Sequence, residues 1–148
     1  MRSSKNLVEL IKKFEGFRSR PYLDIVGIPT IGYGSTFYPN GKKVSISDRP
    51  INESFGEELL LSSAGKFENI INSLVTKNIN QNQFDALVSF VFNIGPTAFR
   101  RSTILRKINS NPSDPSIRQE FLRWNKAGGK VINGLTNRRV LESNLYFR

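Results

Sequence analysis

The segment between Asn80 and Gly95 limits most strongly how this chain can fold. Asn80 and Gln83 have the spacing of a capping box, in which each side chain binds the backbone amide of the other residue. The residues after them are apolar on almost every side of a helix: Phe84, Ala86, Leu87, Val88, Phe90, Val91, Phe92 and Ile94. A helix with so little polar surface is buried on nearly all sides. The sequence therefore predicts a helical lobe packed around this segment, which ends at Gly95-Pro96.

Helical periodicity is present on both sides of this segment. An apolar stripe predicts a helix over residues 5–15, which we expect to end with Gly16 in the left-handed conformation. Asn52 is a predicted N-cap, and the pattern after it predicts a connecting helix over about 52–76, or two helices broken near Gly65. Shorter helices are predicted at about 102–109, 115–125 and 136–147, with a cap at Asp114 and turns at Gly128-Gly129 and Gly134.

Residues 17–46 have a different pattern. Glycine and proline interrupt short runs of Ile, Val, Tyr and Thr, which predicts a small antiparallel sheet with tight turns, one of them at Asn40-Gly41. The 148 residues are enough for one domain with a substantial core. We therefore expect a single, mainly helical α+β domain. Its sheet lobe, at about 16–50, is joined by the connecting helix to a helical lobe at about 80–148, which the N-terminal helix completes.

The chain contains neither cysteine nor histidine. This excludes disulfides, thiolate metal sites and the Ser-His and Cys-His nucleophile systems. Proton transfer near neutral pH must therefore come from Asp, Glu, Lys or Tyr side chains. No cluster of metal ligands is visible, so we expect no metal and no cofactor.

The formal net charge is +10, and residues 79–148 carry most of the excess. Such a surface attracts polyanions, which include nucleic acid, anionic lipid and bacterial wall polymers, and charge alone does not choose among them. The residues at the N-terminus form no apolar run long enough for a signal peptide or a membrane span. We therefore expect the protein to be made and held in the cytoplasm.

Two carboxylates and a threonine form the candidate catalytic group. Glu15 lies at the end of the N-terminal helix, Asp24 lies in a turn-rich segment, and Thr30 opens a Gly-x-Gly strand. Acid–base chemistry on a sugar linkage needs two carboxyl groups on opposite sides of one bond. The spacing alone is weak, because a chain with 12 acidic residues contains many such pairs. If these residues are not catalytic, Glu15 is a surface residue at a helix end, Asp24 is a turn residue and Thr30 is an ordinary strand residue.

Several separated motifs strengthen this interpretation. They are Glu15-x8-Asp24-x5-Thr30, Thr30-Ile31-Gly32-Tyr33-Gly34, the segment Gln83 to Gly95, the segment Phe121 to Lys130, and Gly134-Leu135-Thr136-Asn137-Arg138-Arg139. In this order, over about residues 7–147, the chain resembles the phage-type lysozymes, the endolysin muramidases of glycoside hydrolase family 24. Many members have histidine where this chain has Ser35, so histidine–carboxylate support of that loop is missing. Some members also carry an N-terminal membrane anchor, and from the residues before Leu7 we expect none here.

The resemblance implies a lysozyme-like fold and hydrolysis of the β-1,4 bond between N-acetylmuramic acid and N-acetylglucosamine. Glu15 would be the general acid, kept protonated by its apolar neighbours Phe14 and Phe17. Asp24 would stay ionised, stabilise positive charge at the anomeric carbon and orient water together with Thr30. This arrangement favours inversion of configuration.

The resemblance also implies a set of substrate contacts. Arg138 would approach and position Glu15, and the sugar cleft would be lined by Gly34, Phe92, Asn93 and Ser102. Alternatively, Arg138 is a solvated residue of the last helix and Phe92 is a core residue. The implied partner is the peptidoglycan glycan strand, and the positive charge would attract anionic wall polymers. We expect a monomer that binds no nucleic acid and does not insert stably into membranes. It would stay in the host cytoplasm until it is released to the wall.

Three other functions stay open at this point. The chain could be a lytic transglycosylase. It could be a non-catalytic basic module that binds wall polymer or nucleic acid through Trp124 and the basic residues Arg118, Arg123, Lys126 and Lys130. It could also disrupt membranes through its cationic C-terminal helices.

Overall fold

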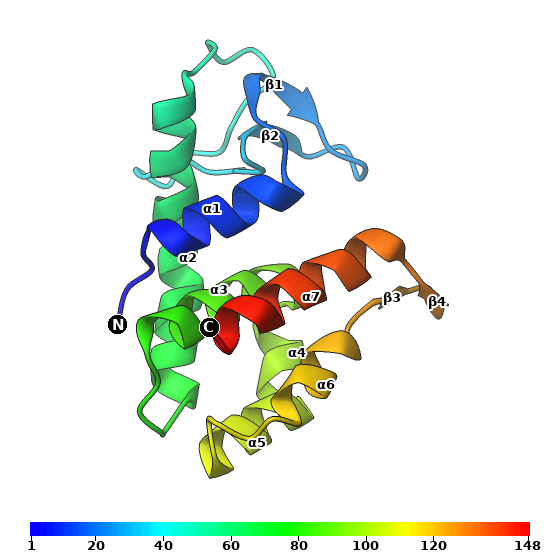
Figure 1. The fold of residues 1–148 in the computed structure, drawn as a ribbon. Helices are drawn as coiled ribbons and strands as arrows, with labels where there is room; N and C mark the ends of the chain where they lie inside the picture. Colours follow the sequence, from blue (N-terminus) through cyan, green and yellow to red (C-terminus); the bar gives the residue numbers. More distant parts are fainter.

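Helix α3 (Gln81–Ile94) lies at the centre of the helical part of the computed structural model, which describes residues 1–148. All of its residues from Phe84 to Val91 are buried. The capping box forms as predicted, because Asn80 Oδ1 accepts the Gln83 amide at 2.8 Å and Gln83 Oε1 accepts the Asn80 amide at 2.9 Å. The helices α1 (Lys5–Phe14), α2 (Glu53–Leu74) and α7 (Asn133–Tyr146) pack against it (Figure 1). The predicted central helix is confirmed.

Helix α1 ends differently from the prediction. Ser4 caps its start by accepting the Asn6 amide at 3.2 Å, and Leu7, Val8, Leu10 and Ile11 are buried. The last helical residue is Phe14, and Glu15 is extended, with φ −115° and ψ 130°. The expectation of a left-handed Gly16 is wrong, since Gly16 has no positive φ. The reason is that the chain leaves the helix through extended backbone that continues directly into a strand.

The sheet is smaller than the pattern of residues 17–46 suggests. Strands β1 (Arg18–Leu23) and β2 (Pro29–Gly32) pair antiparallel, with Tyr22 opposite Thr30. Beyond them only isolated bridges form, at Ile31–Ser35 and Phe37–Lys43. The turn at Asn40-Gly41 is confirmed: Gly41 has φ 83°, and its amide donates to the Tyr38 carbonyl at 2.9 Å.

Helix α2 joins the sheet part to the helical part (Figure 1). Asn52 caps it, as predicted, by accepting the Phe55 amide at 2.8 Å, and the helix is continuous through Gly65. Its first half packs on the sheet, where Ile31, Val44 and Leu59 form a small second core beside the main helical core. The exact limits of the two lobes stay a prediction.

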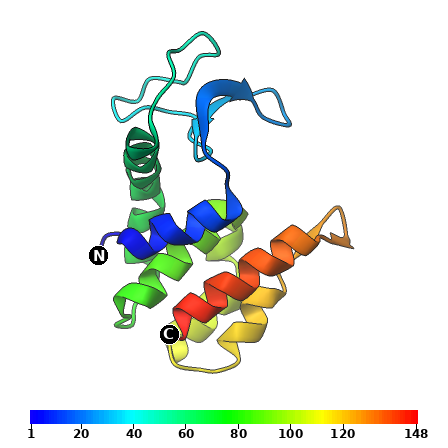
Figure 2. The ribbon, with the colours of Figure 1, turned by 45° about the horizontal axis from the view of Figure 1, so that its top comes forward.

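The remaining elements complete the helical part (Figure 2). They are α4 (Pro96–Arg100), α5 (Thr103–Ser110), α6 (Ile117–Leu122), the two-residue strands β3 (Lys126–Ala127) and β4 (Lys130–Val131), and α7. Elements α4, β3 and β4 were not predicted from the sequence. The predicted helix at 115–125 is shorter, at Ile117–Leu122, and the prediction of a cap at Asp114 is wrong. Asp114 Oδ1 accepts the amide and hydroxyl of Ser116 and so holds a turn before α6, which delays the start of the helix. Gly134 lies inside α7 and not at a turn.

None of the helices combines the length and apolar character that crossing a membrane requires.

Candidate active site

Glu15 projects from the end of α1 beside the sheet. Its carboxyl group is half-buried, and this burial raises its pKa above the usual value, while the positive charge of Arg138 acts in the opposite direction. Gly34, which has φ 88°, lies next to it, because a Cβ atom at Gly34 would stand 4.0 Å from Glu15 Cδ. The structure therefore brings the predicted acid, the predicted strand glycine and the predicted arginine together.

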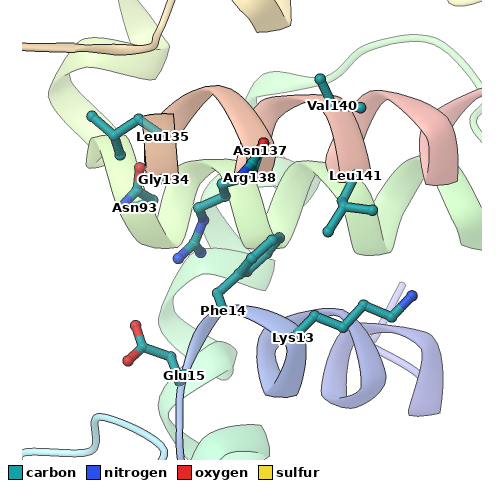
Figure 3. A pocket seen from close by; sticks show the side chains of 10 residues that line it. All are labelled: Lys13, Phe14, Glu15, Asn93, Gly134, Leu135, Asn137, Arg138, Val140 and Leu141. Atoms are coloured by element: carbon teal, nitrogen blue, oxygen red, sulfur yellow. The ribbon is translucent and has the colours of Figure 1, made fainter. Parts of the chain in front are cut away.

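Arg138 is buried and held from three sides. Its Nη2 donates to the Ser89 carbonyl at 3.0 Å, its Nε lies 3.2 Å from Glu142 Oε2, and its guanidinium lies 4.6 Å from the centroid of the Phe14 ring. Figure 3 shows the guanidinium pointing from α7 toward the end of α1, between Asn93 and Phe14. Arg138 is thus a fixed positive charge near Glu15, and not a solvated arginine.

Glu142 is the residue that fixes this arginine, and the sequence analysis gave it no role. It is fully buried, accepts the Ser89 hydroxyl at 2.6 Å, and pairs with Arg139, whose Nε lies 2.8 Å from Oε1. Burial raises the pKa of Glu142, and the two arginines oppose that effect. The sequence did contain a sign of this ion pairing, because the motif Arg138-Arg139-x-x-Glu142 places one carboxylate at i,i+3 and i,i+4 from two cations on a helix.

Asp24 lies in the turn between β1 and β2. Its Oδ1 accepts the amides of Val26 at 2.9 Å and Ile28 at 2.8 Å, so this oxygen holds the turn. Its second oxygen, Oδ2, accepts no hydrogen bond from the chain. The residue is therefore a turn residue, as the alternative interpretation expected, and it still has one carboxylate oxygen for another partner.

Thr30 is buried on β2, close to the same turn. Its hydroxyl donates to the Ile28 carbonyl at 2.8 Å. Because the hydroxyl proton is used in this bond, the oxygen is left to act as an acceptor.

Tyr22 links Asp24 and Glu15 electrostatically, although sequence reasoning did not single it out. Burial raises the pKa of its hydroxyl, the charge of Glu15 and more weakly that of Asp24 raise it further, and the charge of Arg18 acts in the opposite direction. Both carboxyl groups thus act on one hydroxyl. The guanidinium of Arg18 covers its ring at 4.3 Å from the centroid.

Two hollows adjoin this group. One, of about 650 Å³, is lined by Phe14, Glu15, Asn93, Leu135 and Arg138 among others (Figure 3). The other, of about 460 Å³, is lined by Gly34, Phe37, Lys66, Phe67 and Phe92 among others. Gly34, which lines the second hollow, lies beside Glu15, which lines the first, so the two hollows adjoin near the Glu15 carboxyl. We refer to the two hollows together as the groove.

The predicted sugar-binding residues differ in their surroundings. Phe92 and Asn93 line the groove, and Asn93 Oδ1 also accepts Arg139 Nη2 at 2.8 Å. Ser102 is buried at the start of α5, where its hydroxyl accepts the Leu105 amide and donates to the Phe99 carbonyl. It lines neither hollow. Sugar binding by these residues stays a prediction, and Ser102 already has a role as a helix cap.

No group of three or more acidic side chains is arranged to hold a metal ion.

Comparisons with known proteins agree on one family. Residues 12–142 match the family described as phage lysozyme. The endolysin of Salmonella phage P22 is 42% identical over 128 residues, which cover 86% of each chain. The endolysin of Bacillus phage B103 is 37% identical over 99% of this chain, which spans about half of that protein, 54% of its length.

Solved structures give the same result. A crystal structure of a P22 lysozyme mutant has a TM-score of 0.89 and 40% identity, covering 100% of this chain and 99% of the other. The muramidase domain of SpmX from Asticaccaulis excentricus has a TM-score of 0.79 and 35% identity, covering 99% and 98%. The chain therefore belongs to the phage lysozyme family and has the lysozyme-like fold.

Proposed function

We propose that the chain is an endolysin-type muramidase, which hydrolyses the β-1,4 bond between N-acetylmuramic acid and N-acetylglucosamine in bacterial peptidoglycan. The observation that carries this proposal is a half-buried carboxyl group, Glu15, whose pKa is raised by burial and which lines a hollow of about 650 Å³ at the end of α1. The names of the related proteins, endolysin and lysozyme, support the same reaction.

Glu15 is the proposed general acid. A raised pKa keeps the carboxyl group protonated closer to neutral pH, so that it can protonate the leaving glycosidic oxygen. Arg138 then stabilises the carboxylate that remains after the proton has left. Because Arg138 is held by Ser89 and Glu142, it supplies this charge without rearrangement.

Asp24 and Thr30 are the proposed pair that orients the attacking water. Asp24 Oδ2 is unoccupied by the chain, and the Thr30 oxygen is left as an acceptor after its proton is donated to Ile28. A water molecule that donates its two protons to these two oxygens directs a lone pair away from them, toward an anomeric carbon in the groove. Attack by such a water gives inversion, for which carboxyl groups roughly 6.5–9.5 Å apart are typical.

The groove is the proposed binding site for the glycan strand. Gly34 allows the backbone to approach a sugar ring, Phe92 offers an apolar surface in the same hollow, and Asn93 offers an amide in the hollow beside Glu15. Ser102 would bind sugar only by giving up its cap bonds. The net charge of +10 would concentrate the protein on anionic wall polymers. We propose a monomer that is held in the host cytoplasm until it reaches the wall.

The test is hydrolysis of purified peptidoglycan by the Glu15→Gln variant. Loss of a general acid lowers the rate by about 10²–10⁴-fold. Glu9→Gln is the matched control, because Glu9 lies on the same helix with its side chain 70% exposed. Its activity should equal that of the unmodified protein.

Mass spectrometry and NMR of the released fragments decide the reaction type. Muramic acid with a free reducing end identifies hydrolysis, and an anhydro-muramic end identifies a transglycosylase. An α-anomer released first identifies inversion. Full activity of Glu15→Gln would contradict the role of Glu15 as the general acid, and an unmodified protein that releases no fragments would favour a binding or membrane-active role.

A further inference from the structure

Two hairpin tips expose large aliphatic side chains. We call them together the hairpin surface; it consists of Leu23, Ile25, Val26 and Ile28 in the β1–β2 turn and Val131 and Ile132 at β4. Ile25 is fully exposed, and Val26 is 73% exposed. Isolated exposed aliphatic residues are common, but groups of them in one place mark a surface for interaction.

The two tips extend to the same side of the molecule. In Figures 1 and 2 the β1–β2 turn and the β3–β4 hairpin both project to the right, one from the sheet part and one from the helical part. The second tip adjoins the hollow beside Glu15, because Gly134 and Leu135, which line that hollow, directly follow β4. Since both tips project to one side, a flat partner on that side can contact both.

Backbone hydrogen bonds hold both tips in place. In the first, the Asp24 amide donates to the Ile28 carbonyl at 3.0 Å and the Gly27 amide donates to the Asp24 carbonyl at 2.9 Å. In the second, the Ile132 amide donates to the Asn125 carbonyl at 2.9 Å. The aliphatic side chains are thus presented to solvent by ordered turns.

Basic side chains lie on both hairpins. Arg18 and Arg20 lie on β1, and Lys126 and Lys130 lie on the second hairpin; all four are exposed and form no salt bridge. Asp24 is the one acidic residue of the first tip, and its Oδ1 is used by the amides of Val26 and Ile28. The sequence contains no acidic residue between Glu120 and Glu142. The charge and the apolar character of the surface thus require a partner that offers both anions and a hydrocarbon layer.

We propose that the hairpin surface binds reversibly to an anionic lipid bilayer. The aliphatic tips enter the headgroup boundary, and the four basic side chains pair with lipid phosphates. A glycan strand offers hydroxyl and acetamido groups, for which aliphatic tips provide no hydrogen bonds. An acidic peptide would satisfy the cations without covering six aliphatic side chains. In the bound state the end of the groove between the tips faces lipid, so that membrane binding and wall binding exclude each other.

The test is co-sedimentation with vesicles. One set contains phosphatidylglycerol and phosphatidylethanolamine, and the other contains phosphatidylcholine alone. We expect binding to the anionic set only. The double variants Ile25→Ser/Val26→Ser and Val131→Ser/Ile132→Ser should each weaken it at least about tenfold, because aliphatic burial is lost. Lys126→Gln and Lys130→Gln should each weaken it about fivefold.

Leu61→Ser is the matched control, because Leu61 is an exposed aliphatic residue on α2, outside the hairpin surface. It should bind like the unmodified protein, and thermal melts verify that every variant is folded. The measurements are repeated with Glu15→Gln, so that the result does not depend on the proposed glycosidase activity.

Four results would overturn the proposal. Equal binding to both vesicle sets would remove the role of charge, and equal weakening by Leu61→Ser would remove the role of the hairpins. Hairpin variants that keep vesicle binding but lose wall hydrolysis would assign the surface to the wall substrate. A dimer in light scattering that these variants abolish would assign it to a second copy of the chain.

Discussion

Replacing Gly34 by alanine should weaken both folding and activity, for two separable reasons. Gly34 has φ 88°, a conformation that side chains rarely adopt, so alanine costs about 1–3 kcal/mol of the free energy of unfolding. The new methyl group would lie 4.0 Å from Glu15 Cδ, which is an ordinary contact with the protein. It would, however, occupy space beside the acid where the sugar must approach. A displacement of the substrate by about 1 Å lowers kcat/KM about 100-fold.

Gly95→Ala separates the two effects. Gly95 has φ 92° and ψ 153°, a region adopted almost only by glycine, and a Cβ atom there meets nothing within 4 Å. Its backbone cost falls in the same range of about 1–3 kcal/mol. Gly95 ends α3 and lines neither hollow, so activity per folded molecule should be unchanged.

Urea unfolding gives the stability of each variant, and release of soluble peptidoglycan fragments gives kcat/KM at a temperature where both are folded. We expect similar losses of stability and a loss of kcat/KM for Gly34→Ala alone. Equal losses of kcat/KM in the two variants would show that reduced stability explains the activity loss of each. Full activity of Gly34→Ala would place the substrate away from Gly34 and refute the groove assignment.

Two further predictions concern the buried charges. Burial raises the pKa of Glu15 above its unfolded value of 4.5, so the native state binds more protons between pH 4.5 and the native pKa, and stability falls as pH rises through this range. Glu15→Gln should therefore be more stable than the unmodified protein in urea unfolding at pH 7, with no advantage below about pH 4; an equal advantage at both would contradict this. Glu142→Gln leaves two buried arginines without their anion and should cost about 3–5 kcal/mol in the same assay, against no change for the exposed Glu9→Gln.

The sequence predicts best those features that are determined locally. The capping box at Asn80, the cap at Asn52 and the turn at Asn40-Gly41 each depend on a few neighbouring residues, and all three form. The end of α1 was predicted wrongly because glycine only permits a left-handed turn and does not require one. A strand begins soon after Gly16, and the path of the chain into the sheet determines an extended Glu15.

The candidate site could be predicted only in part, for a related reason. Glu15, Gly34 and Arg138 come from three distant segments, and no periodicity indicates that they meet; the resemblance to a family supplied that information. The same limit explains why Glu142 was overlooked. On α7 it is one more charged residue, and only packing against α3 shows that it is fully buried.

The position of Glu15 combines two unfavourable conditions for a carboxylate. The C-terminal end of a helix carries partial negative charge, and burial disfavours the ionised form, so both act to keep the proton on Glu15. An unpaired arginine at the position of Arg138 would oppose them strongly. Arg138 instead shares the buried carboxylate of Glu142 with Arg139, which offsets part of its positive charge. The pairing on α7 therefore lets Arg138 stand near the acid without removing the proton that the proposed reaction needs.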